Sequence, residues 1–311
     1  MAFFSVIIPL YNKADHIEDT IKSVLNQTFT DFEIIIINDE STDESEALVL
    51  GFNDIRIQLY SQENQGVSVA RNLGIEKAKY EYIAFLDADD LWMENHLETL
   101  KDLIETYPNA GIYASRYELV FKNLSKKIPK FNGLSFDFKG YVNDYFYATQ
   151  NNSLSLTLVT AVPKSIFSAI GNFDIEITSG QDIDMWLRIA LKYPIVISNK
   201  ITASYLHYIE GSLSKTSILN KKTIRFNEYI NEENKNPSLK KYLDIYRMEY
   251  ALQYKIAGAN KKSQELYMNI LKENISLKSK VLYHLPQWIL VVLLKTKRFL
   301  RNKGIDFSIY Q

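Results

Sequence analysis

Short apolar runs alternate with amphipathic segments through the first 115 residues of the chain. The amphipathic segments repeat apolar residues every three or four positions, which gives a helix one buried face. Apolar runs separated by such helices are typical of an α/β domain with a mainly parallel sheet. The expected strands are residues 4–8, 32–37, 55–60, 82–86 and 111–114.

The segments between these strands predict helices. Ile17, Ile21 and Val24 form one apolar stripe at helical spacing. Ser41 and Glu44 have the spacing of a capping box, so we expect a helix with Ser41 as its N-cap. The same periodicity predicts further helices at 67–79 and 96–107.

The pattern changes twice later in the chain. Residues 116–150 are irregular and aromatic, and beyond Ser214 the composition shifts to Lys, Asn, Glu and Tyr with helical periodicity. We therefore expect two regions, a domain at 1–214 and a helical region at 215–311. The further elements expected are a strand at 153–162, helices at 164–170 and 183–191, and a helical hairpin at 250–271.

The overall composition excludes some classes of partner and of functional site. The 311 residues carry 36 Lys and Arg against 37 Asp and Glu, so there is no basic field to recruit nucleic acid. The absence of cysteine excludes disulfides and thiolate metal sites, and suits a reducing, cytoplasmic compartment. The amino terminus lacks the basic start and cleavage site of a signal peptide, and no apolar stretch has the roughly 18 residues that span a bilayer.

Acidic and polar residues follow three of the expected strands. Asn12 comes after the first strand, Asp39 after the second, and Asp87 and Asp89 after the fourth. In a parallel sheet these carboxyl ends meet at one edge, where ligands bind. Each cluster alone also suits a turn or a helix cap. Two carboxylates at 87 and 89 repel unless a cation lies between them, and a hard divalent ion with oxygen ligands suits that position.

Such an ion, Mg²⁺ or Mn²⁺, commonly completes its shell with substrate phosphate, which indicates a nucleotide diphosphate. The chain has neither the G-x-G-x-x-G of a dinucleotide site nor the G-x-x-x-x-G-K-[ST] of a P-loop. Hydride transfer and ATP hydrolysis are therefore disfavoured.

Five linked motifs in the first 90 residues closely resemble the family 2 glycosyltransferases with the GT-A fold. The motifs are SVIIPLYN, SVLNQT, INDESTD, NQGVSVARNLG and FLDADD, and the resemblance resumes at GNFD and GQDIDMWLR. It covers about residues 1–214. It implies an inverting, metal-dependent transferase that moves a sugar from a nucleotide-diphosphate donor to a saccharide or lipid-linked glycan acceptor in cell-surface polysaccharide synthesis. The expected donor is a UDP-sugar.

The resemblance assigns donor contacts to residues near the nucleotide. Tyr11 is expected against the base, with Pro9 and Asn12 shaping its pocket and Asp39 accepting hydrogen bonds from the base edge. Arg71 is expected to neutralise or cover the donor, although it also suits a solvated helix position.

The same resemblance assigns Asp87 to the ribose or the metal, Ala88 to the nucleotide-sugar site, and Asp89 to direct metal binding. Asp90 is expected to cap the next helix or support the loop, and Trp92 either walls the acceptor site or anchors the loop.

Asp182 is the expected general base, which takes the proton of the acceptor hydroxyl. Capping of the helix that follows is the alternative role. The family commonly has Glu-Asp here, whereas this chain has Gln181 before the aspartate, which puts acceptor contacts or the pKa of the base in doubt. The family's Tyr-Arg-x-His segment is also altered, so His207 is a candidate metal ligand that also suits a packed or surface histidine.

Residues 279–303 combine a short apolar run with five basic residues from Lys295 to Lys303 and no acid among them. This composition fits an interfacial helix on the anionic inner face of the cell membrane, and equally a helix packed on the domain.

Two alternatives to this function differ in what they require. A sugar-nucleotide pyrophosphorylase shares the α/β layout but needs a Gly-rich basic loop after the first strand, where this chain has PLYN. A catalytically degenerate nucleotide-sugar-binding or membrane-scaffold protein is consistent with the two departures from the family pattern, but not with intact Asp39, Asp87, Asp89 and Asp182.

Overall fold

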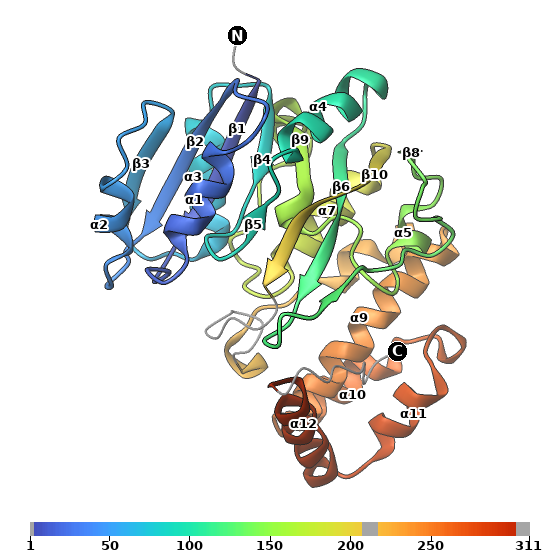
Figure 1. Cartoon of the computed structure of the whole chain (residues 1–311). Helices are drawn as coiled ribbons and strands as arrows, with labels where there is room; N and C mark the ends of the chain where they lie inside the picture. The colour runs from blue at the N-terminus through green and yellow to red at the C-terminus, as the bar shows by residue number, and fades with distance from the viewer. Residues whose placement is uncertain (1–2, 207–216, 303–311) are drawn as a thin grey trace.

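The structure is a computed structural model of the chain, and it describes residues 3–206 and 217–302 (Figure 1). A mixed sheet crosses its amino-terminal part in the order β3-β2-β1-β4-β9-β6-β10-β5, with β7 beside β6 and β8 beside β10. The strands are β1 (Phe4–Leu10), β2 (Phe32–Asp39), β3 (Ile57–Gln62), β4 (Tyr82–Phe85), β5 (Leu91–Trp92), β6 (Ile112–Val120), β7 (Lys126–Lys127), β8 (Gly140–Tyr141), β9 (Thr160–Pro163) and β10 (Ile195–Leu206).

The long strands of the sheet share one direction. β1 pairs parallel with β2 and β4, β2 with β3, and β6 with β10. Because β9 is antiparallel to both β4 and β6, those two strands point the same way. The carboxyl ends of β1, β2, β4, β6 and β10 therefore meet at one edge. The chain leaves β1 for β2 on one side and returns as β4 on the other, so the gap between β1 and β4 is the topological switch point.

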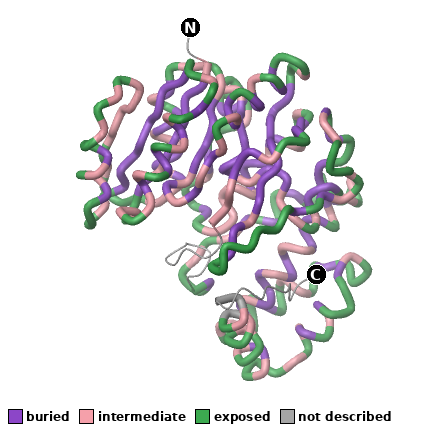
Figure 2. The backbone as a smooth tube through the Cα atoms, in the orientation of Figure 1, coloured by how far each residue is buried: buried purple, intermediate pink, exposed green. Residues whose placement is uncertain are grey.

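The sheet is buried on both faces, as the apolar runs predict. Every residue of β2 is buried and so is every residue of β1 except the half-buried Pro9, which places a purple band through the centre of Figure 2. Helix α3 packs so closely on β1 that a Cβ on Gly74 would lie 2.5 Å from a methyl carbon of Ile7. The helices of this part are α1 (Ile17–Leu25), α2 (Ser45–Leu50), α3 (Val67–Lys77), α4 (His96–Thr106), α5 (Tyr145–Ala148), α6 (Lys164–Ile170) and α7 (Gln181–Ala190).

Two local predictions were wrong. Helix α2 begins at Ser45, not after Ser41, because the Ser41 hydroxyl accepts the backbone N–H of Asn12 and the Asp43 carboxylate accepts that of Ser45. The expected strand at 153–162 is shorter, since a 3₁₀ turn at Thr157–Val159 precedes β9.

Helices make up most of the described chain after residue 217. They are α8 (Ile230–Glu233), α9 (Pro237–Ile256), α10 (Asn260–Met268), α11 (Leu277–His284) and α12 (Gln287–Asn302). Helix α9 joins two cores, because Leu239 and Tyr242 pack with the sheet core while Met248 and Leu252 belong to a smaller cluster with the last helices. The expected hairpin is present, as α9 and α10 pack together across Gly258. Among the described helices, none has the length and apolarity needed to cross a membrane.

Candidate active site

Asp87 and Asp89 lie directly beyond β4, beside the end of β1. The β1 strand continues into Tyr11, Asn12 and Lys13, so the two loops face each other across the switch point. Crevices at this position of an open α/β sheet bind ligands. The structure thus brings the residues that follow the first and fourth strands into one site.

Each of the two carboxylates has a cationic partner. The Lys13 ammonium lies 2.6 Å from Oδ2 of Asp89, and the two side chains are each 19% exposed. An Nη of Arg71 donates to Oδ1 of Asp87 at 2.6 Å. Arg71 is buried while Asp87 remains one-third exposed, so the guanidinium lies beneath a carboxylate that solvent reaches. Arg71 is therefore part of the site, not a solvated helix residue.

Asp182 lies in the first turn of α7 and belongs to the same charge cluster. Burial raises the pKa of its carboxyl group and the nearby charge of Asp87 raises it further, whereas Arg71 lowers it. These effects place the Asp182 carboxylate near both members of the Arg71–Asp87 pair. The structure brings together the three carboxylates that the motifs selected.

The residue before α7 fixes where Asp182 lies. Gly180 adopts a left-handed conformation with φ of 82°, and a Cβ there would meet the Tyr250 hydroxyl at 2.5 Å. That hydroxyl donates to the carbonyl of Ser179 at 3.1 Å. The Tyr250 side chain of α9 therefore fixes the loop before α7, and only glycine fits at position 180.

Hydrogen bonds connect the loops that follow β1 and β2. Asn12 has φ of 50°, donates its backbone N–H to Ser41 and accepts the N–H of Thr42 at its side-chain oxygen. Tyr11 beside it is 48% exposed, which leaves its ring available to a ligand. Pro9 pairs in register with Ile37 at the ends of the two strands.

Asp39 is buried and organises the loop that enters α3. Its carboxylate accepts the backbone N–H groups of Gln65 and Gly66, at 3.0 and 2.9 Å, and the side-chain amide of Gln62 at 2.7 Å. The residue that was expected to read the nucleotide base therefore also holds the start of the helix that carries Arg71. A carboxylate has about four acceptor positions, so a further hydrogen bond from a ligand is compatible with these three.

The motif reasoning missed Lys13, whereas Asp90 has one of its two expected roles, support of the loop. The position of Lys13 was the available signal, since it is a basic residue that directly follows PLYN at the end of the first strand. Asp90 is buried, and its Oδ1 accepts the backbone N–H of Leu206, so it ties the end of β10 to the Asp87–Asp89 loop. Burial and the two neighbouring aspartates raise the pKa of Asp90 well above its usual range.

Trp92 anchors the loop. It is buried, its indole N–H donates to the carbonyl of Leu158 at 2.7 Å, and its ring stacks on His96. His207, by contrast, falls outside the described residues.

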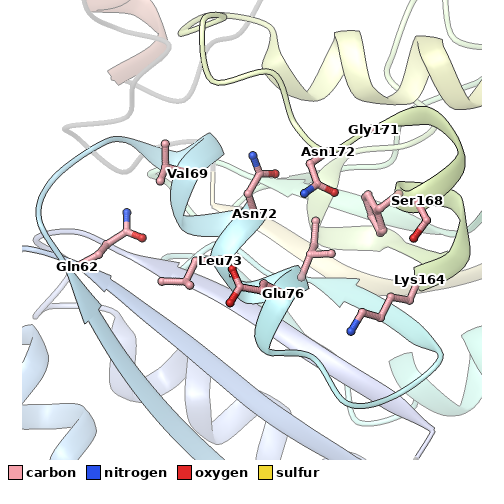
Figure 3. A pocket seen from close by; sticks show the side chains of 11 residues that line it. Gln62, Val69, Asn72, Leu73, Glu76, Lys164, Ser168, Gly171 and Asn172 are labelled. Carbon is pink, nitrogen blue, oxygen red and sulfur yellow. The ribbon is translucent and has the colours of Figure 1, made fainter.

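A hollow of about 600 Å³ lies behind the site, between α3 and α6 (Figure 3). At its rim the side-chain amide of Asn72 both donates to and accepts from the backbone of Phe173, at 2.8 and 2.9 Å. This pair holds the GNFD segment against α3. The residues that line the hollow are Gln62, Val69, Asn72, Leu73, Ile75, Glu76, Lys164, Phe167, Ser168, Gly171 and Asn172, which include none of the three site carboxylates.

The amino-terminal sequence also matches a known family. Residues 5–165, more than half of the chain, match the family described as Glycosyl transferase family 2. The chain belongs to this family. The resemblance read from the motifs is thereby confirmed.

Curated relatives of this family 2 glycosyltransferase chain match parts of it. A putative teichuronic acid biosynthesis glycosyltransferase, TuaG of Bacillus subtilis, is 46% identical over 30% of this chain and 38% of its own length. An Escherichia coli protein, UDP-Glc:alpha-D-GlcNAc-diphosphoundecaprenol beta-1,3-glucosyltransferase WfgD, is 37% identical over 38% of this chain and 47% of its own. An uncharacterized glycosyltransferase of Rickettsia conorii is 33% identical over 61% of the chain and 30% of its own. The matches thus span less than half the length of each of these relatives.

Solved structures confirm the fold. Residues 1–349 of Staphylococcus aureus TarS, crystallised with UDP-GlcNAc, superpose with a TM-score of 0.59 and 17% identity, over 85% of this chain and 89% of that one. The longer TarS structure gives a TM-score of 0.64 and covers 97% of this chain and 55% of its own. The mainly parallel sheet flanked by helices is therefore the GT-A arrangement that the motifs predicted.

The donor set of this family 2 site fits a hard divalent cation. Asp87 and Asp89 offer carboxylate oxygens, and Mg²⁺ or Mn²⁺ is commonly held by one or two carboxylates with substrate phosphate completing the shell. Within residues 3–206 and 217–302, no cluster of three His, Cys, Asp or Glu could hold an ion alone. Water or the donor diphosphate would complete the shell of an ion held by Asp87 and Asp89.

Proposed function

We propose that the chain is an inverting, metal-dependent glycosyltransferase that moves a sugar from a nucleotide-diphosphate donor to a saccharide or lipid-linked glycan acceptor in cell-surface polysaccharide synthesis. The observation that carries this proposal is the cluster of Asp87 and Asp182 around Arg71 at the switch point, with the Lys13–Asp89 pair in the same loops. It combines groups suited to a diphosphate with a separate carboxylate suited to accept a proton.

A UDP-sugar is the donor we favour. Tyr11 offers an exposed ring and Asp39 a buried carboxylate on the adjacent strand end, as stacking and edge recognition of a base require. The names of two similar proteins add support, since TarS was crystallised with UDP-GlcNAc and the name of WfgD includes UDP-Glc.

Asp182 would act as the general base. As the acceptor oxygen forms its bond to the anomeric carbon, its proton passes to the Asp182 carboxylate and the bond from that carbon to the donor diphosphate breaks. A raised pKa makes a carboxylate a stronger base, so burial of Asp182 favours proton acceptance. Attack on the face opposite the leaving diphosphate inverts the anomeric centre.

The remaining charges would serve the diphosphate. Mg²⁺ or Mn²⁺, which Asp87 and Asp89 would hold, would supply positive charge to the departing diphosphate when bound. Lys13 is a further cation at the same position, because its ammonium already lies against Asp89. Arg71 keeps Asp87 in place and offsets the charge of Asp182.

We also propose that α12 rests on the anionic inner face of the cell membrane. Trp288, Val292 and Phe299 recur at helical spacing and are 69%, 54% and 58% exposed, while Leu290 on the other side of the helix is buried. The basic residues between 295 and 303 complement anionic lipid headgroups. A lipid-linked acceptor would then lie within reach.

Vesicle binding tests this membrane contact. We expect wild type to sediment with vesicles that contain phosphatidylglycerol, and Trp288→Ser with Phe299→Ser to sediment much less. Leu277→Ser is the matched control, because Leu277 is 76% exposed but belongs to α11. Equal binding by both variants would remove the membrane proposal.

Turnover tests the enzymatic proposal. Release of UDP from a panel of UDP-sugars, with saccharide acceptors and Mn²⁺, should be seen with wild type and lost in Asp89→Ala. If wild type and Asp89→Ala are equally inactive on every pair while both bind UDP alike, the chain is a nucleotide-sugar-binding protein instead.

A further inference from the structure

A second cavity, of about 640 Å³, lies between the α5 segment and α9 and is lined by neither Asp87 nor Asp89. Its walls come from residues 132–153, from α9 and from residues 273–279, and α5 and α9 lie side by side in Figure 1. Ligand sites in proteins commonly have volumes of roughly 300 to 1,000 Å³. The cavity is therefore large enough for a small ligand or for several units of a chain.

The lining of this cavity is polar but carries few charges. Side-chain amides and hydroxyl groups dominate, together with the rings of Tyr147 and Tyr246. The charged side chains in the lining are Lys241, Glu249 and Glu273, and the charge of Lys297 also acts on Glu249. Amides and hydroxyls match the hydroxyl groups of a saccharide, whereas a lining without net positive charge offers an anionic polymer no attraction.

Hydrogen bonds fix the first wall before any ligand arrives. The amide nitrogen of Asn152 donates to the carbonyl of Lys130 at 2.9 Å, and that of Asn132 donates to the carbonyl of Tyr147 at 3.0 Å. Asn151 in turn donates to the side-chain oxygen of Asn132 at 2.6 Å. With its nitrogen engaged in this way, the Asn152 amide presents its oxygen to accept from a ligand hydroxyl.

A buried carboxylate fixes the opposite wall. Asp244 on α9 is fully buried and accepts the backbone N–H of Leu271 at 3.1 Å and the side-chain amide of Asn274 at 2.8 Å. Lys240 and Arg247 balance its charge. The segment that carries Glu273 and Asn274 is thus held against α9, and the cavity does not depend on a ligand to form its shape.

A row of tyrosines connects the cavity to the Asp182 loop. Tyr242, Tyr246 and Tyr250 recur every four residues and so share one face of α9. Tyr246 lines the cavity, while Tyr250 binds the Ser179 carbonyl two positions before Gln181. Four residues at a rise of about 1.5 Å each separate these two tyrosines by about 6 Å along the axis. The ring centroids of Tyr242 and Tyr246 lie 5.0 Å apart, and burial, followed by the charges of Glu249 and Asp182, raises the pKa of Tyr246.

We propose that this cavity binds an uncharged saccharide segment of the acceptor, which lies against Tyr147 and Tyr246 of its lining. The proposal rests on the function proposed above and adds the chemical class of the acceptor. Sugar hydroxyls would bind the amides of the walls, and the apolar faces of the rings would lie on the tyrosines. Anionic acceptor segments would gain no attraction from this lining.

Binding of defined glycans tests this site. Full-length wild type is applied to an array of neutral and anionic oligosaccharides, and affinities for the bound glycans are measured by calorimetry. Gln150→Trp places a large side chain in the cavity from its lining. Gln264→Trp is the matched control, because Gln264 is exposed on α10 outside the cavity.

We expect wild type and Gln264→Trp to bind neutral oligosaccharides, and Gln150→Trp to bind them at least about tenfold more weakly. Glu249→Gln, which removes charge without volume, should reduce discrimination against anionic glycans. Absence of neutral-glycan binding by wild type, preference for anionic glycans, or equal affinity in Gln150→Trp would overturn the proposal.

Binding of UDP, measured on the same samples, separates this proposal from the enzymatic one. All four proteins should bind UDP alike if the cavity serves the acceptor alone. If wild type binds glycan but not UDP, the proposed donor site is refuted and the proposed saccharide site is not.

Discussion

The sheet edge and the α9 face differ in how they are built for a ligand. At the sheet edge, charged side chains form close pairs, Lys13 with Asp89 and Arg71 with Asp87. At the α9 face, tyrosines and side-chain amides line a cavity of low charge. Charge suits a nucleotide diphosphate and uncharged polar groups suit a glycan, so the two substrates are separated by chemistry as well as by position. Asp182 is linked to the sheet edge through Arg71 and Asp87, and to α9 through the hydrogen bond of Tyr250 to Ser179.

The largest effect should come from the residue where the two regions meet. Asp182→Asn removes proton acceptance but keeps shape and hydrogen bonding, so turnover should fall by about 10²- to 10⁴-fold. UDP release under saturating donor and acceptor measures it. Asp174→Asn is the control, because Asp174 instead pairs with Arg225 outside the cluster. Turnover within about threefold of wild type would contradict the role of Asp182.

The pH profile of wild type sharpens the same assignment. Burial, followed by the charge of Asp87, raises the pKa of Asp182 above its ordinary value of 3.8, despite the opposing effect of Arg71. The base must be ionised, so turnover should be lost as pH falls through this raised pKa. An acid limb centred at or below the ordinary value would show that Asp182 is not the titrating base.

Removal of Arg71 should lower the stability of the fold more than removal of a more exposed arginine. In Arg71→Met the Asp87 carboxylate loses its partner beside Asp182, and we expect unfolding free energy to fall by about 3 kcal/mol, the lower end for a broken buried pair, because Asp87 is one-third exposed. Arg56→Met breaks the more exposed Arg56–Asp54 pair and should cost at most about 1 kcal/mol. Urea denaturation of both variants makes the comparison, and equal losses would contradict it.

Asp244→Asn should affect the α9 face alone. It removes the charge that holds Lys240 and Arg247, and should lower the unfolding free energy by about 2 kcal/mol. Glycan affinity should fall because the cavity wall is released, whereas UDP affinity should not change. Calorimetry with UDP and with a neutral oligosaccharide tests both, and a matching loss of UDP affinity would show that the two regions are not independent.

The smallest effect concerns Lys13. Its ammonium competes with any metal ion for Asp89, and the pair is worth at most about 1 kcal/mol because it is partly exposed. Lys13→Met should therefore bind Mn²⁺ up to about fivefold more tightly without nucleotide, and UDP more weakly. Weaker Mn²⁺ binding in this variant would mean that Lys13 supports the ion site.

Much of the site at the sheet edge could be predicted from sequence because it depends on short, local patterns. Each apolar run identifies a strand, each strand end identifies its loop, and parallel strands bring those loops to one edge. Asp87 and Asp89 were found in this way, whereas Asp182 was assigned through the family resemblance of GQDIDMWLR. Lys13 was not, because its partner lies 76 residues away and the pairing depends on the order of the strands.

The α9 face could not be predicted because it depends on docking. A tyrosine at every fourth residue predicts only that these side chains share one face of a helix. The sequence does not identify the loop that packs against this face. The Ser41 prediction failed for a related reason, since its hydroxyl binds Asn12 of another loop instead of capping the helix. Local patterns identify elements, while contacts between distant segments decide what their side chains do.

The account rests on a division between donor binding at Asp89 and proton transfer at Asp182. Calorimetric titration of UDP into wild type, Asp89→Ala and Asp182→Asn, each with and without Mn²⁺, tests this division directly. We predict that Mn²⁺ strengthens UDP binding in wild type and Asp182→Asn, and has no effect in Asp89→Ala. An equal loss of Mn²⁺-dependent affinity in both variants would contradict the account.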